Sequence, residues 1–194
     1  MNERLARMDI SVFVAILAML GFGVVLVYSS SFALAQDRFG GAGFFLERQV
    51  VRVLIALVFF VFFINVDYHV WGKLSAVGYM VSLALLAVVL ALPESQAVNG
   101  AKRWLAFGSF RFQVSEFARL ALIVMLAARC DELGDEVRSV GRYAQMAAKV
   151  AVVCLLVVLE PDFSTALIIG MVGMTILFVG GASTWHLAVT GLLA

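Results

Sequence analysis

Long apolar segments alternate with short polar segments along the whole chain. A helix needs about 20 predominantly apolar residues to cross a bilayer. Six runs approach that length, and a seventh begins at His186 and continues to Ala194. The pattern predicts an all-α fold, a polytopic bundle of about six to seven transmembrane spans that forms a single transmembrane domain, residues 1–194. The six runs are residues 10–32, 49–64, 74–92, 114–128, 144–159 and 163–180.

Composition agrees with a membrane protein and excludes a soluble domain. Hydrophobic residues make up 63% of the chain, charged residues 14%, and the mean hydropathy is +1.04. Soluble domains carry about 25% charged residues. The net charge of +1 gives no reason to expect a nucleic-acid partner. Cys130 and Cys154 belong to no Cys-x-x-Cys or Cys/His cluster, so we expect two free thiols.

The orientation of the bundle follows from its basic residues, because cytoplasmic loops carry an excess of Lys and Arg. The first apolar run is too long for a signal-peptide core, so we expect it to remain as the first span. With the N-terminus inside, basic residues divide equally between the two sides. Setting aside Arg48, Arg52 and Arg119, which fall on helices, leaves an inner majority and predicts a cytoplasmic N-terminus. The remaining outer basic residues indicate an anionic ligand on the outer face.

The outer segment before the fourth run, residues 93–113, mixes cations with aromatic side chains. This mixture is typical of a segment that lies flat at a membrane interface as an anchor. A turn at Asn99-Gly100 would instead direct both Lys102 and Arg103 at one anion. Both interpretations remain open.

A charged pair opens the fourth run, where Gln113 and Ser115 precede Glu116 and Arg119. Glu116 and Arg119 are three residues apart and therefore share a helix face. Either charge alone in lipid would cost several kcal/mol, so we expect the two to pair. The pair either locks helices together or lines a polar cavity open to the outer leaflet, and charges within a membrane favour the second reading.

The junction of the fifth and sixth runs holds two carboxylates, Glu160 and Asp162, on either side of a proline. Asp162 or Ser164 would cap the following helix. Alternatively, the carboxylates would bind a divalent cation or tune a proton.

The second run opens with two arginines, Arg48 and Arg52, four residues apart on one helix face. Their side chains would snorkel to lipid headgroups or extend the anion-binding surface.

Five segments, in this order, resemble the SEDS family (FtsW/RodA/SpoVE), membrane glycosyltransferases that polymerise lipid II into peptidoglycan. The asparagine-glycine pair before Lys102 and the phenylalanine after Asp162 are more similar to the division branch, FtsW, than to the elongation branch, RodA. The segments are VYSSS (27–31), FLERQ (45–49), VNGAKRW (98–104), FQVSEFAR (112–119) and EPDFSTA (160–166).

The chain departs from the family pattern at four positions. The family usually has proline at Val114, lysine at Arg119, glutamine at Glu160 and glycine at Ser164. An arginine is a forked, permanently charged donor and is not equivalent to a lysine. These departures concern the fine geometry of the site.

The resemblance implies a peptidoglycan glycosyltransferase acting at the outer face of the bacterial cytoplasmic membrane during cell division. In such an enzyme Arg48, Lys102 and Arg103 would bind the pyrophosphate of lipid II. The central cavity would be lined by Gln113, Ser115, Glu116, Arg119 and Asp162. Implied partners are lipid II, membrane lipids, a class B penicillin-binding protein and division proteins. No cofactor is certain, and a divalent cation, Mg²⁺ or Mn²⁺, is the candidate.

The family has about ten spans, roughly twice this chain, and its essential aspartate lies in an outer loop after the seventh span. No catalytic residue is therefore assigned here, and we expect a sequence truncated within the seventh span, before that aspartate. Two alternatives remain: a flippase for a lipid-linked cell-wall precursor, because charges in a polar cavity suit transport equally well, or an inactive fragment.

Overall fold

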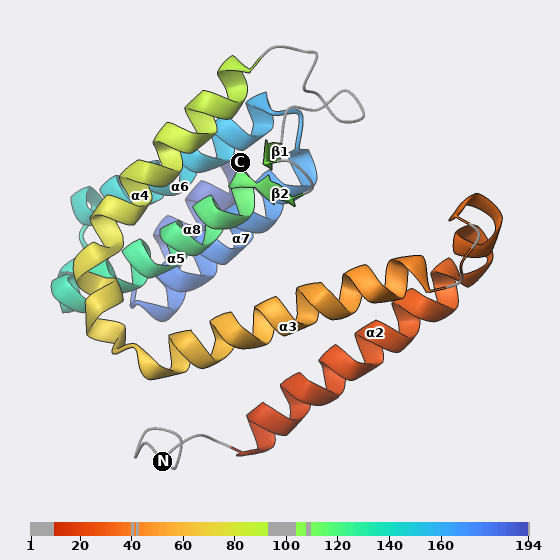
Figure 1. Ribbon diagram of the computed structural model, residues 1–194. Helices are drawn as coiled ribbons and strands as arrows, with labels where there is room; N and C mark the ends of the chain where they lie inside the picture. Colours follow the sequence, from red (N-terminus) through yellow and green to blue (C-terminus); the bar gives the residue numbers. More distant parts are fainter. Residues whose placement is uncertain (1–9, 40, 42, 93–103, 108–109, 194) are drawn as a thin grey trace. The chain divides into compact units, whose positions relative to one another are not determined.

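A computed structural model describes residues 10–39, 41, 43–92, 104–107 and 110–193 (Figure 1). Contacts divide the chain into two compact units, Met1–Asp67 and Tyr68–Ala194. Each unit is described by itself below.

The first unit is a pair of packed helices, α2 (Ile10–Phe39) and α3 (Phe44–Asn65). The rings of Phe13, near the start of α2, and Phe60, near the end of α3, stack with their centroids 6.1 Å apart. The two helices therefore run antiparallel. No described side chain of α3 is buried within the chain, so its apolar surface is left for lipid or for other protein.

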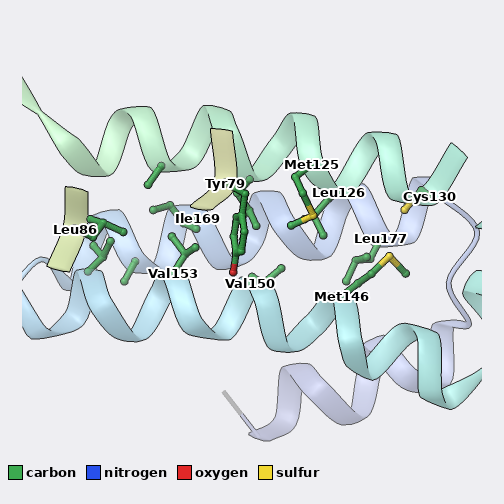
Figure 2. Packing of buried hydrophobic residues seen from close by; sticks show 14 of the residues in the cluster. Tyr79, Leu86, Met125, Leu126, Cys130, Met146, Val150, Val153, Ile169 and Leu177 are labelled. Carbon is green, nitrogen blue, oxygen red and sulfur yellow. The ribbon is translucent and has the colours of Figure 1, made fainter. Parts of the chain in front are cut away.

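The second unit contains the hydrophobic core. Helix α4 packs on α5, α5 on α7, and α6 on α7, while α8 contacts α7. Figure 2 shows side chains from the four longer helices meeting in the core, among them Leu86, Leu126, Val153 and Ile169. The elements are α4 (Tyr68–Ala91), β1 (Trp104–Phe107), β2 (Phe110–Gln113), α5 (Val114–Leu133), the short 3-10 helix η2 (Gly134–Arg138), α6 (Val140–Leu159), α7 (Phe163–Val179) and α8 (Thr184–Leu193).

The prediction of an all-α, polytopic membrane fold is confirmed. Each predicted apolar run corresponds to one helix, and the bounds of the run and the helix differ by up to seven residues. Helix α3 begins five residues earlier than predicted, at Phe44, because its first turns contain Glu47 and Arg48, which interrupt the apolar pattern but not the helix. Three described helices are long and apolar enough to cross a membrane: residues Ile10–Asp37 of α2, α4 and α6.

The last part of the segment for which the sequence left an interfacial anchor and an anion-binding turn open forms a short β-hairpin. The turn predicted at Asn99-Gly100 lies outside the described residues. Strands β1 and β2 pair antiparallel, with Leu105 opposite Phe112. Both of these side chains pack against the helical core, which attaches the hairpin to the start of α5. Two aromatic-rich runs separated by Gly108-Ser109 are a recognisable hairpin signal, so the sequence contained this information.

Candidate functional site

Short connections make the helices of the second unit alternate in direction. Helix α5 runs to η2, α6 returns, and α7 runs back after the turn at residues 160–162 (Figure 1). The starts of α5 and α7 and the end of α6 therefore share one end of the bundle, called here the hairpin end. The opposite end, where η2 lies, is called the η2 end.

The Glu116–Arg119 pair lies in the first two turns of α5, at the hairpin end. The Arg119 guanidinium donates a hydrogen bond to the Glu116 carboxylate, which makes an ion pair along one helix face. The Arg119 side chain is 30% exposed and that of Glu116 is 45% exposed. The predicted pairing is present, and its partial exposure leaves both groups accessible to a ligand at this end.

Two further predicted residues flank this pair. Gln113 is half-buried and occupies the N-cap position of α5 without a side-chain capping hydrogen bond. Ser115 is 0% exposed, and its hydroxyl has no hydrogen-bond partner among the described residues. A buried polar group without a partner costs about 1–3 kcal/mol, so the Ser115 hydroxyl lowers the stability of the folded protein.

Asp162 occupies the N-cap of α7 and is 3% exposed. Its carboxylate accepts hydrogen bonds from the Thr165 backbone N–H at 3.3 Å and from the Ser164 hydroxyl at 3.2 Å. The N-terminus of a helix stabilises negative charge, so the cap fits a carboxylate. The capping interpretation thus holds, and the serine that replaces the family's glycine takes part in it.

Glu160 immediately follows α6 and is 1% exposed. Two buried acidic residues, Glu160 and Asp162, therefore lie two positions apart at the hairpin end. The sequence singled out both as carboxylates beside a proline, but it did not indicate that both would be buried.

Of the three predicted pyrophosphate ligands, the structure describes only Arg48. Arg48 belongs to the first unit, is exposed, and places its guanidinium carbon 4.2 Å from the centroid of the Phe44 ring. This contact is a cation–π interaction on one helix turn. Lys102 and Arg103 lie outside the described residues.

The described residues do not form a metal centre by themselves. Among them, no group of three or more His, Cys, Asp or Glu side chains could hold an ion. Glu160 and Asp162 supply two carboxylates at most, so the divalent cation stays a prediction and no step below depends on it. Cys130 and Cys154 are free thiols, as predicted.

These features define a class of protein. It is a polytopic membrane protein whose apolar helices carry an ion pair, a buried hydroxyl and two buried acidic residues at one end of the bundle. Residues 10–194 match the FtsW/RodA/SpoVE family, described as a cell cycle protein. The chain belongs to this family.

Curated relatives agree with this assignment. The chain is 36% identical over 180 residues to a probable peptidoglycan glycosyltransferase FtsW of Nitrosococcus halophilus, covering 92% of this chain and 46% of the relative. It is 32% identical over 193 residues to the FtsW of Trichlorobacter lovleyi that carries the same description, covering 98% and 50%. The chain therefore spans about half the length of the curated relatives it matches.

Two solved structures have a similar fold. The crystal structure of the rod shape determining protein RodA of Thermus thermophilus aligns with a TM-score of 0.70 and 29% identity, over 88% of this chain and 56% of RodA. A structure described as coordinating polymerization and crosslinking in a peptidoglycan synthase complex aligns with a TM-score of 0.68 and 29% identity, over 89% and 51%.

Proposed function

We propose that this chain is the substrate-facing part of a peptidoglycan glycosyltransferase that polymerises lipid II, in the division branch of its family. The main observation in support is the Glu116–Arg119 ion pair, which lies at the hairpin end of a chain that belongs to the FtsW/RodA/SpoVE family. The curated relatives described as probable peptidoglycan glycosyltransferases support this proposal.

The proposed reaction places chemical demands on the site. A sugar 4-hydroxyl of one lipid-linked disaccharide attacks the anomeric carbon of another, and undecaprenyl pyrophosphate leaves. The hydroxyl needs a base, and the departing pyrophosphate needs positive charge. We assign the charge to Lys102, Arg103 and Arg48, and no residue of this chain is assigned as the base.

The remaining predicted residues have positioning roles in this proposal. Glu116 holds Arg119 through their ion pair, and Asp162 fixes the start of α7 by capping it. Gln113 and Ser115 present polar groups beside the pair. We propose that these five residues surround the central cavity that the whole enzyme forms at the hairpin end.

We also propose the membrane in which the enzyme acts and its protein partner. The apolar helices place the chain in a membrane, and we assign the bacterial cytoplasmic membrane with the hairpin end on its outer face. A neighbour structure described as a synthase complex that coordinates polymerization and crosslinking supports a class B penicillin-binding protein as partner.

The test uses a protein in which this chain is fused to the second half of a curated FtsW relative. Purified in detergent and given lipid II, this protein should form glycan polymer, because an enzyme needs no membrane asymmetry. A flippase would make no polymer under these conditions, and that result would contradict the proposal.

Two matched substitutions connect the activity to the ion pair. Glu116→Gln should lower the polymerisation rate by roughly 100-fold, because a small displacement of Arg119, which Glu116 holds in place, can cost that much. Glu132→Gln is the control, because Glu132 accepts a hydrogen bond from Arg129 on the same helix at the η2 end, with the same three-residue spacing. Equal rates for the two variants would exclude the role assigned to Glu116.

A further inference from the structure

Three basic side chains, those of Arg129 on α5 and of Arg142 and Lys149 on α6, lie in the half of these helices nearer the η2 end, and two of them have acidic partners. Arg129 donates a hydrogen bond to Glu132 at 2.8 Å. Arg142 lies 3.4 Å from Glu136. Lys149, by contrast, makes no hydrogen bond or ion pair through its side chain with any part of the chain that the structure describes.

Lys149 lies well inside a membrane-crossing helix. It comes nine residues after Val140, the first residue of α6, which corresponds to about 13.5 Å along the axis. Its backbone carbonyl accepts a hydrogen bond from the Tyr79 hydroxyl at 3.1 Å, which fixes this part of α6 against α4. The Lys149 residue is partly exposed within the second unit, and no described side chain neutralises its ammonium group.

The direction of the side chain follows from the helix. Every Cα–Cβ bond in an α-helix tilts toward the helix N-terminus, which for α6 is the η2 end. The flexible four-carbon stem can carry the ammonium group further in that direction. Lys149 therefore reaches toward the headgroup layer nearest to it.

The surroundings of Lys149 add positive charge. Arg129 on α5 is close enough for the two like charges to interact. Arg142 is seven residues before Lys149 and so lies on nearly the same face of α6, with the exposed Gln145 between them. Polar groups therefore continue from the η2 end of the helix up to Lys149.

We propose that Lys149 binds the phosphate of an anionic phospholipid in the leaflet at the η2 end. A phosphate offers several acceptor oxygens, so it can be shared between the ammonium group and neighbouring donors. A lipid approaches from the exposed side of α6, and snorkelling together with local thinning of the bilayer brings its headgroup within reach. The bound phosphate would lie toward the η2 end, away from Glu116 at the hairpin end, and the proposal does not depend on the proposed function.

The test measures lipid selectivity of the chain in phosphatidylcholine bilayers that contain a small fraction of spin-labelled lipid. Electron paramagnetic resonance gives the association of spin-labelled phosphatidylglycerol relative to spin-labelled phosphatidylcholine. The unsubstituted chain should prefer phosphatidylglycerol. Lys149→Met should lower this preference about fivefold, the effect expected for one lysine at an anionic surface, whereas Lys149→Arg should keep it.

Lys73→Met is the matched control. Lys73 is an exposed lysine in the first two turns of α4, at the same end of the bundle. Its removal should change the preference less than removal of Lys149 does. Equal losses in the two variants would indicate diffuse surface attraction and overturn the proposal. An unchanged preference in Lys149→Met would also overturn it and would indicate a carboxylate from another span as the counter-charge.

Discussion

Two buried serines on neighbouring helices differ in one respect. Ser82 on α4 and Ser115 on α5 are both 0% exposed. The Ser82 hydroxyl donates to the Tyr79 carbonyl at 2.7 Å, whereas the Ser115 hydroxyl has no partner among the described residues. A hydroxyl kept at a cost in stability is typical of a functional position.

Replacing Ser115 should therefore stabilise the protein. Ser115→Ala removes a buried, unbonded hydroxyl and should raise the free energy of unfolding by about 1 kcal/mol. Ser82→Ala removes a hydrogen-bonded hydroxyl and should leave stability equal or lower. Denaturant titrations of the purified proteins, followed by circular dichroism, compare the two. A Ser115→Ala protein less stable than Ser82→Ala would show that the Ser115 hydroxyl is satisfied in the folded state.

Helices α6 and α7 approach each other closely at a glycine. A Cβ atom placed on Gly173 would lie 2.8 Å from both γ-methyl groups of Val150, below ordinary van der Waals contact. At Gly170, one turn earlier, a Cβ would lie 3.7 Å from the Cys154 sulfur, which is an ordinary contact. The same helix therefore contains one glycine required by packing and one that is not.

Alanine at these two positions should have opposite effects. Gly173→Ala should lower the free energy of unfolding by about 1–2 kcal/mol, because overpacking outweighs the gain in helix propensity. Gly170→Ala should be neutral or stabilising. The same denaturant titration measures both.

Combining Gly173→Ala with Val150→Ala should recover part of the stability lost in the single variant, since it removes the two methyl groups in the way. A double variant that recovers nothing, or a Gly173→Ala protein as stable as Gly170→Ala, would contradict the close approach.

The proposed function depends on the orientation of the whole molecule in the membrane, because it assigns the hairpin end to the outer face. The excess of basic residues on one side predicts that η2 faces the cytoplasm and the hairpin faces outward. In a protein carrying Cys130→Ala and Cys154→Ala, single cysteines introduced as Ser109→Cys and Asp135→Cys report the two ends.

A membrane-impermeant maleimide added to intact cells should label the Ser109→Cys protein. The Asp135→Cys protein should react only after the cells are permeabilised. The reverse pattern would place the N-terminus outside and would remove the outer-face location from the proposed function.

The sequence by itself determined the features that depend on local spacing. Apolar runs that approach bilayer length predicted about six to seven helical spans, because a backbone in lipid must satisfy its hydrogen bonds within each segment. The three-residue spacing of Glu116 and Arg119 predicted their ion pair, and the position of Asp162 after Pro161 predicted a helix cap.

Only the tertiary structure decided which polar groups are buried and which lack partners. Burial depends on neighbours far apart in the chain, and no spacing rule contains them. Ser115 and Glu160 are enclosed because helices from different parts of the sequence meet at the hairpin end. Lys149 has no ion-pair partner among the described residues, whereas Arg129 and Arg142 pair with Glu132 and Glu136. Such differences arise when the helices pack together, not when each helix forms.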